Sequence, residues 1–161
     1  SALTGHLVIS TLHTNDAPST VNRLLDMGVE DYLLTSTVNG ILAQRLVRSL
    51  CTDCREPYEP LPEVVKEFEL ERFTDDTPIM LYRPVGCEAC GGTGYSGRLG
   101  IMEMMPMTDT IRSLVMRHAI SGEIRRQAID EGMQTLYEDG LRKVLAGTIT
   151  LDEVLRVTRE D

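Results

Sequence analysis

The four cysteines of the sequence form two matched pairs, and this pairing constrains the fold more than any other feature. Cys51 and Cys54 make the first C-x-x-C pair, and Cys87 and Cys90 make the second, with 32 residues between the pairs. In each pair the two-residue gap lets the chain turn sharply enough for both sulfurs to reach one ion. Two such pairs supply four thiolates in a tetrahedron, which Zn²⁺ prefers in closed structural sites. We therefore predict a structural Zn²⁺ site, with residues 55–86 as a loop whose ends are held together.

Other chemistry for the same cysteines stays open at this point. A single C-x-x-C is typical of a redox dithiol, but a redox centre needs no second copy, and no thioredoxin-like pattern surrounds either pair. Two disulfides would form in an oxidising compartment, with three connectivities to choose among. Four cysteines also bind iron–sulfur clusters, although the spacings in those families differ from this one. The spacing favours zinc over these alternatives.

Composition narrows the class of protein. A chain of 161 residues makes one ordinary domain, or a domain with a small appendage. Its net charge of −9 argues against a nucleic-acid partner, because neutralising phosphates requires a basic face. No apolar run approaches the roughly 20 residues that span a bilayer, so we expect no transmembrane segment. The chain begins without Met, and we interpret it as a piece of a longer protein.

A polar cluster follows the first apolar run. Residues 7–12 are short, apolar and β-branched, which predicts a strand buried on both faces of a parallel sheet. His13, Thr14 and Asn15 come next, and Asn15 or Asp16 can cap the following helix. Ligands bind at the carboxyl ends of strands in open α/β sheets, and helix N-termini favour anions, so this cluster is a candidate sensor of a phosphate or of water. The alternative is that these residues only cap the helix and make local hydrogen bonds.

Two strand patterns flank the cysteine loop. A helix that starts near residues 30–31 is expected to give way near Ala43 to a strand over 44–50, which leads into the first cysteine pair. A second strand, over 99–105, follows the second pair and is expected to run antiparallel to the first. The cysteine loop is then the tip of a hairpin. The ion would hold the two ends of this loop together, which would otherwise be flexible.

Helical periodicity fills residues 108–161 and predicts a small helical bundle. Ser121 is expected to cap its second helix. Thr150 and Glu153 fit a capping box at the start of the last helix. Arg48 is expected to lie at a solvated strand edge.

Several motifs resemble those of the secretion and pilus-assembly ATPases, the general secretion pathway protein E family. The resemblance covers essentially the whole chain and is weakest over residues 60–82. The matching stretches are residues 2–16 (ALTGHLVISTLHTND), 23–28 (RLLDMG), 43–48 (AQRLVR), 94–98 (GYSGR) and 153–161 (EVLRVTRED), together with the two C-x-x-C pairs.

This resemblance implies an α/β fold, the C-terminal portion of a RecA-like P-loop ATPase domain. A tetracysteine zinc module would be inserted in a hairpin, and a C-terminal helical bundle would follow. The implied domains are part of the ATPase core over 1–50, the zinc module over 51–90, a returning strand over 91–107 and the bundle over 108–161.

The resemblance also implies a function. Such ATPases are hexameric motors on the cytoplasmic face of the inner membrane, and they couple ATP hydrolysis to pseudopilus assembly in type II secretion. An ATPase of type IV pilus assembly is the nearest alternative, and a stand-alone zinc-bearing protein-interaction module is the alternative from another class. The implied partners are further copies of the chain and inner-membrane platform proteins, with ATP and Mg²⁺ bound by the parent protein.

The residues carried over from the family are few. The stretch from His6 to His13 matches the family's histidine box, and His13 would sense the γ-phosphate or its attacking water, with Thr14 and Asn15 beside the nucleotide. The metal ligands would be Cys51, Cys54, Cys87 and Cys90. The sequence contains no G-x-x-x-x-G-K-[ST] motif. Without the phosphate-binding loop and a carboxylate for Mg²⁺, catalysis loses its main electrostatic contributions, so we expect this chain alone neither to bind ATP tightly nor to hydrolyse it.

Overall fold

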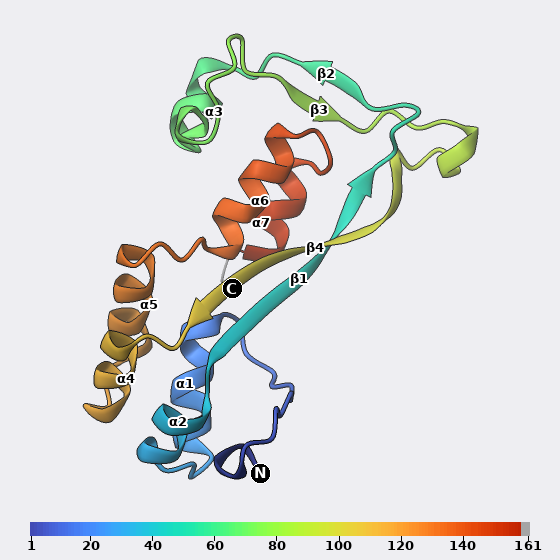
Figure 1. Ribbon diagram of the computed structural model, residues 1–161. Helices are drawn as coiled ribbons and strands as arrows, with labels where there is room; N and C mark the ends of the chain where they lie inside the picture. Colours follow the sequence, from blue (N-terminus) through green and yellow to red (C-terminus); the bar gives the residue numbers. More distant parts are fainter. Residues whose placement is uncertain (159–161) are drawn as a thin grey trace. The chain divides into compact units, whose positions relative to one another are not determined.

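The computed structural model describes residues 1–158 and divides the chain into two compact units (Figure 1). The first unit comprises Ser1–Gln44 and Met102–Thr135, and the second comprises Arg45–Ile101 and Leu136–Asp161. The last three residues of the family-like stretch 153–161 lie outside the described residues. The boundary between the units falls inside two strands, which therefore contribute to both.

These two strands, β1 (Gly40–Leu50) and β4 (Tyr95–Pro106), form a two-stranded sheet. Their arrows point in opposite directions in Figure 1, so the predicted hairpin is confirmed. Side chains alternate between the two faces of a strand, and β4 shows this plainly: Ile101, Glu103 and Met105 are buried, while Met102 and Met104 are about half exposed. The cysteine loop connects the two strands.

The first unit is mainly helical. Helix α1 packs against α5, and α2 packs against α4, which also contacts α5. Its buried side chains include Val21, Leu34, Ile111, Val115 and Ile124. The elements of this unit, apart from its halves of β1 and β4, are a 3-10 helix η1 (Ala2–Thr4), α1 (Ala17–Asp26), α2 (Asp31–Thr37), α4 (Asp109–Met116) and α5 (Ser121–Asp130).

The strand predicted over residues 7–12 is absent: this stretch is irregular. Leu7 and Ile9 are 85% and 86% exposed. A strand needs a neighbour to pair its backbone N–H and C=O groups, and within residues 1–158 the two sheets are β1–β4 and β2–β3. The sequence pattern was that of a strand, but no neighbouring strand pairs with it here.

Helix boundaries follow the local chemistry only in part. Asp16 caps α1 as predicted, because its Oδ1 accepts a hydrogen bond from the Ser19 N–H at 2.7 Å. Helix α2 ends at Thr37 rather than near Ala43, and the residues after Asn39 belong to β1. The hydroxyl groups at the end of α2 bond back to carbonyls of the preceding turn, which weakens a helix. The prediction that Ser121 caps α5 was also wrong, because Ile120 is the N-cap residue of this helix and makes no side-chain hydrogen bond there.

The second unit holds the cysteine module, which we define as residues 51–90. A short antiparallel pair stiffens it, with Pro57 opposite Tyr82, and Leu70 and Leu81 are fully buried beside it. Helices α6 and α7 complete the unit, so the helices of residues 108–158 are shared between the two units. The further elements of the second unit are β2 (Glu56–Tyr58), α3 (Pro62–Glu67), η2 (Leu70–Arg72), β3 (Leu81–Arg83), η3 (Glu88–Cys90), α6 (Leu136–Leu145) and α7 (Leu151–Thr158).

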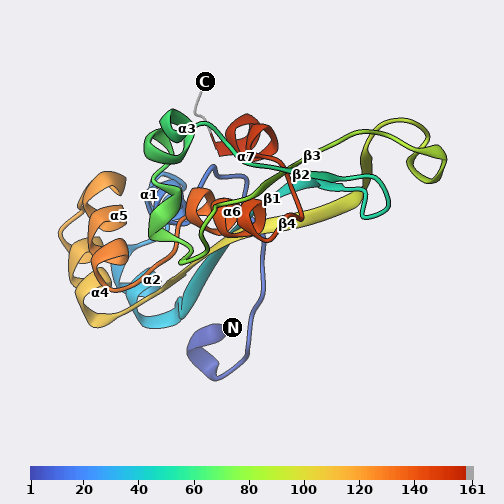
Figure 2. The same cartoon turned by 90° about the horizontal axis from the view of Figure 1, so that it is seen from above.

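Helices α6 and α7 pack closely against each other (Figure 2). Gly140 of α6 permits this approach, because a Cβ at this position would lie 2.7 Å from a methyl carbon of Val154. Val154 is itself fully buried, so it has little room to move.

We expect Gly140→Ala to lower the free energy of unfolding by about 1–3 kcal/mol, the usual cost of overpacking. Gly122→Ala, in α5, is the matched control, because a Cβ there meets nothing within 4 Å and alanine favours a helix. Urea unfolding of both variants and the wild type gives the comparison. Equal effects at the two positions would contradict the packing argument.

None of the helices in the described part of the chain combines the length and the apolar character that crossing a bilayer requires.

Candidate metal centre

The structure brings the four cysteines together at the base of the cysteine module. Cys51 follows the last residue of β1, and a tight turn places Cys54 beside it, with the Arg55 N–H donating to the Cys51 carbonyl at 3.0 Å. The second pair opens and closes η3, and Gly91 ends that turn in the left-handed conformation (φ +61°) that glycine adopts freely. Two short local turns therefore present two sulfurs each.

The distances between the sulfurs suit a single ion. Cys51 Sγ lies 3.9 Å from Cys87 Sγ, Cys54 Sγ lies 3.9 Å from Cys90 Sγ, and the Sγ atoms of Cys87 and Cys90 are 3.8 Å apart. All four lie within 4.8 Å of one another. Zn–S bonds of about 2.3 Å in a tetrahedron place the sulfurs about 3.8 Å apart. A disulfide needs about 2.05 Å, and the four thiols are free.

Backbone N–H groups donate to two of the sulfurs. Cys54 Sγ accepts from the Gly86 N–H at 3.3 Å, and Cys90 Sγ accepts from the N–H groups of Cys87 and Gly94, both at 3.2 Å. The Cys87 N–H is the main reason that the pKa of the Cys90 thiol falls to about 6. Loss of contact with water raises the pKa of Cys54 to about 11. One thiol is thus poised as a thiolate, and the other must lose its proton to bind a metal ion.

The first cysteine pair is also tied to the loop after α6. The Leu50 N–H donates to the Thr148 carbonyl at 2.8 Å, and the Arg55 guanidinium donates to the Gly147 carbonyl. The guanidinium lies over the Tyr82 ring, 4.8 Å from its centre. These contacts fix the first pair on both sides, so the site does not depend on the metal ion alone for its shape.

His13, Thr14 and Asn15, the residues predicted to meet a nucleotide, lie in the first unit, directly before α1. His13 and Asn15 are exposed and Thr14 is half-buried. The Thr14 hydroxyl lies 2.7 Å from that of Thr20 in α1. The three residues therefore stand at a helix N-terminus, as the sequence predicted, although no strand precedes them.

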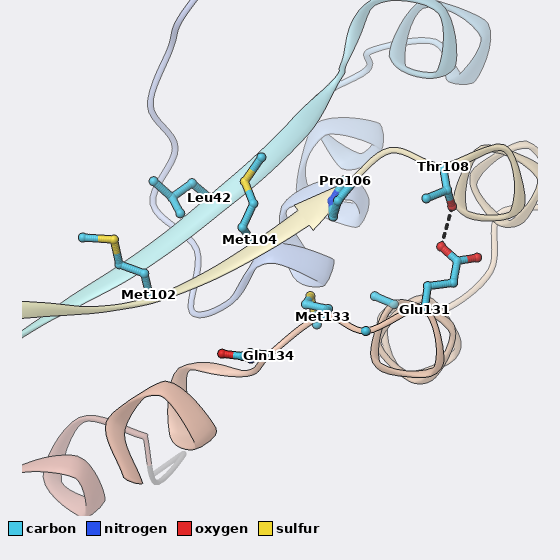
Figure 3. A pocket seen from close by; sticks show the side chains of 10 residues that line it. Leu42, Met102, Met104, Pro106, Thr108, Glu131, Met133 and Gln134 are labelled. Atoms are coloured by element: carbon cyan, nitrogen blue, oxygen red, sulfur yellow. Dashed lines mark hydrogen bonds between the residues drawn. The ribbon is translucent and has the colours of Figure 1, made fainter. Parts of the chain in front are cut away.

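The first unit also contains an apolar groove of about 450 Å³ (Figure 3). Leu42 of β1 and Met102 and Met104 of β4 line one side, and Met133, after α5, lines the other. Glu131 and Thr108 also line the groove. The Glu131 carboxylate accepts a hydrogen bond from the Thr108 hydroxyl at 2.6 Å, and this bond lowers the pKa of Glu131. The groove offers apolar contact rather than reactive groups.

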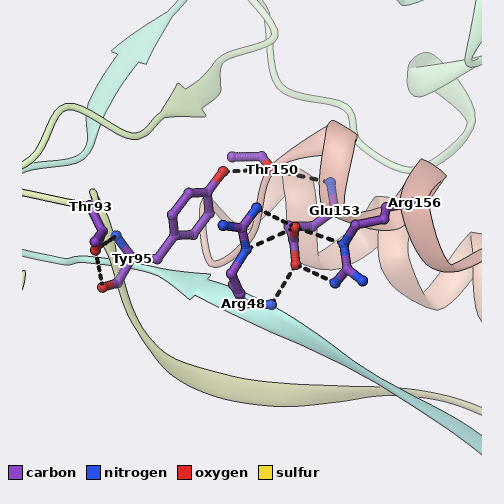
Figure 4. A network of polar contacts seen from close by, with 6 residues as sticks. All are labelled: Arg48, Thr93, Tyr95, Thr150, Glu153 and Arg156. Atoms are coloured by element: carbon purple, nitrogen blue, oxygen red, sulfur yellow. Dashed lines mark hydrogen bonds and ion pairs between the residues drawn. The ribbon is translucent and has the colours of Figure 1, made fainter.

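The second unit contains a polar network around Glu153 that the sequence did not predict (Figure 4). Glu153 of α7 is 1% exposed and accepts from the backbone N–H of Arg48 and from the guanidinium groups of Arg48 and Arg156, at 2.7–3.0 Å. The Arg48 guanidinium also stacks on the Tyr95 ring, 4.2 Å from its centre. Arg48 thus lies at an exposed strand edge, as predicted, with its side chain 53% exposed, but its guanidinium is held by these contacts. The bond from Arg156, followed by that from Arg48, lowers the pKa of Glu153 to about 2.

This network also alters the predicted capping box of α7. Thr150 caps the helix, because its Oγ1 accepts from the Glu153 N–H at 3.3 Å. The Glu153 carboxylate binds the two arginines instead of completing the box. The predicted cap at Thr150 is confirmed, whereas the Glu153 side chain belongs to the ion-pair network.

Fold and site together define an α/β protein with a four-cysteine module inserted between paired strands. The model of the type II/IV secretion system protein family matches residues 1–156. The chain belongs to this family.

Curated relatives match almost the whole chain. It is 57% identical, over 99% of its length, to the type II secretion system protein E of Xanthomonas campestris pv. campestris. It is 46% identical to the type II secretion system ATPase E of Vibrio cholerae, again over 99% of its length, and 46% identical over all of it to the type IV pilus assembly ATPase PilB of Myxococcus xanthus. The chain spans 28%, 31% and 28% of these three relatives, respectively.

Proposed function

We propose that this chain is the C-terminal part of a motor ATPase that powers type II protein secretion. The observation that carries the proposal is the match of nearly the whole chain to a type II secretion system protein E, at 57% identity, and to a type II secretion system ATPase E, at 46% identity. An ATPase of type IV pilus assembly is the second candidate, supported by the PilB relative at 46% identity.

Deleting the gene for the protein that carries this chain distinguishes the two candidates. The first predicts that secreted enzymes accumulate inside the cell while pili still form, and the second predicts the reverse. Restoring the lost phenotype with the wild-type gene, but not with a gene truncated before this chain, would assign the function to this region. A deletion strain normal in both respects would refute the proposal.

We propose further that Cys51, Cys54, Cys87 and Cys90 hold one structural Zn²⁺. Sulfur separations of 3.8–3.9 Å support a single tetrahedral ion over a cluster, in which several ions lie between the sulfurs. Once bound, the ion would cross-link the two ends of the cysteine module. Zinc and iron analysis of the purified protein, with thiol counting after chelation, tests this: one zinc and four thiols per chain are expected, and any disulfide would contradict it.

For the parent protein we propose a RecA-like core that includes residues 1–50 and the returning strand 91–107, with His13 at the γ-phosphate or its attacking water and Thr14 and Asn15 beside the nucleotide. Their position at the N-terminus of α1, where the helix dipole favours anions, supports this assignment. Mg²⁺ and the phosphate-binding loop would come from parts of the parent outside this chain. The proposed assembly is a hexamer at the cytoplasmic face of the inner membrane, held by platform proteins of the secretion machine.

The nucleotide assignment is tested in the parent protein. His13→Ala is expected to lower ATP turnover at least tenfold, whereas His118→Ala, at an exposed histidine outside this segment, is the control and should leave it within twofold. The present chain alone is expected to show no turnover above background. Turnover by the chain alone, or equal loss in both variants, would overturn the assignment. Metal binding without any ATPase activity in the parent would instead favour a zinc-bearing interaction module.

A further inference from the structure

The second unit contains two glycines that touch the cysteine cluster through their backbone alone. The Gly86 N–H donates to Cys54 Sγ at 3.3 Å, and the Gly94 N–H donates to Cys90 Sγ at 3.2 Å. Gly94 also accepts a hydrogen bond through its carbonyl from the Cys51 N–H at 2.9 Å, so it joins the second cysteine pair to the first. Each glycine lies outside the C-x-x-C motif whose sulfur it contacts.

Both positions admit only glycine. Gly86 and Gly94 have φ values of +105° and +77°, which side chains rarely adopt. A Cβ at Gly86 would lie 2.5 Å from the Gly92 carbonyl oxygen, and one at Gly94 would lie 2.4 Å from Pro84 Cβ. These obstacles are backbone and proline ring atoms, which cannot rotate away. A side chain would therefore displace the N–H group from its sulfur.

We propose that Gly86 and Gly94 are positioning residues for the metal ion, which set its affinity by holding N–H groups against Cys54 and Cys90. The inference rests on the proposed metal site. Four thiolates around a divalent cation leave excess negative charge, and N–H donors to sulfur stabilise that charge. They also orient the sulfurs before the ion arrives. Loss of such outer contacts typically costs about 10- to 100-fold in metal affinity.

The hydrogen bonds can be detected directly in the intact chain loaded with ¹¹³Cd²⁺, which replaces Zn²⁺ at thiolate sites. We expect scalar coupling between ¹¹³Cd and the amide protons of Gly86, Cys87 and Gly94, transmitted through the N–H···S bonds. Gly91 and Gly92 serve as internal controls, because their N–H groups donate to the carbonyls of Glu88 and Cys87 rather than to sulfur. A ¹¹³Cd resonance without coupling at Gly86 and Gly94 would overturn the inference.

Alanine variants measure the contribution to affinity. Gly86→Ala and Gly94→Ala are compared with Gly91→Ala and Gly92→Ala, which share the positive φ but meet nothing within 4 Å. Competition with a chelator is expected to show a loss of about 10- to 100-fold for the first two and less than about tenfold for the controls. Equal losses in all four would mean that backbone strain alone is responsible, and the inference would fail.

A failure of the proposed metal site can be distinguished from a failure of the inference about the two glycines. If the wild-type chain binds neither Zn²⁺ nor Cd²⁺, the proposed metal centre is wrong, whatever the variants do. If Gly86→Ala or Gly94→Ala does not fold, the coupling measurement in the wild type still decides the inference.

Discussion

Cys90→Ser is expected to reduce zinc affinity by at least about a hundredfold, more than the loss of an outer contact costs, and to loosen the two ends of the cysteine module. A serine hydroxyl is not ionised at neutral pH, so three thiolates remain around the ion. Holding together the ends of the 32-residue loop opposes about 3 kcal/mol of loop-closure entropy, which the bound ion helps to offset. Metal content after gel filtration and amide protection in residues 51–90 measure the two effects.

Thr52→Ser is the matched control for this variant. Thr52 lies between the proposed ligands Cys51 and Cys54 but is exposed, and its hydroxyl donates to the neighbouring Asp53 carboxylate at 3.4 Å. It should retain one zinc per chain. A Cys90→Ser protein that keeps full zinc content and protection would show that the cysteines are not the ligands.

Metal affinity is also expected to rise with pH. The Cys54 thiol, with a pKa of about 11, must release a proton to bind the ion at neutral pH, while Cys90, at about 6, is already largely ionised. Acidification below about pH 6 protonates Cys90 too and should promote release. Chelator competition between pH 6 and 8 tests this, and a pH-independent affinity would contradict it.

Glu153→Gln should lower the free energy of unfolding by up to about 3 kcal/mol at pH 7. The folded pKa of about 2 lies well below the ordinary value for glutamate, and each pKa unit corresponds to about 1.4 kcal/mol. The two arginines are each more than half exposed, so solvent screening reduces the effect below that limit. The neutral amide would leave a buried site facing two guanidinium groups with one oxygen instead of two.

The sign of the pH dependence follows from the lowered pKa. Glu153 contributes its full stabilisation above about pH 4.3, where the unfolded carboxyl is also ionised, and loses it as the pH falls through about 2. The stability difference between wild type and variant should therefore be constant from pH 7 to 5 and shrink below pH 4. Asp152→Asn, at the exposed neighbouring position in α7, is the control and should change stability by less than about 0.5 kcal/mol. An equal loss in both variants would contradict the network's role.

The cysteine centre was predictable because its information is local. Each C-x-x-C forms a turn by itself, and the two flanking strand patterns indicate a hairpin that brings the pairs together. The cap at Asp16 was predictable for the same reason. At these two places a few neighbouring residues decide the geometry, and pattern and structure agree.

Most of the features that the sequence did not predict depended on distant partners. Arg48 and Glu153 are 105 residues apart, and neither position has a periodicity that reveals the other. Residues 7–12 have the composition of a buried strand, yet a strand forms only beside another one. The end of α2 depended on hydroxyl groups that compete for helix carbonyls, whereas apolar spacing alone extended the helix too far.

The bonds from Leu50 and Arg55 to the loop after α6 have a consequence for genetics. Gly147 accepts the Arg55 guanidinium across 92 residues of sequence, and a Cβ there would meet the Tyr82 ring at 2.6 Å. Mutations that make cells sensitive to zinc limitation should therefore arise in this loop as well as among the cysteines. A map of such alleles along the gene would show them at residues 51–54, at residues 87–90 and again in the loop around Gly147.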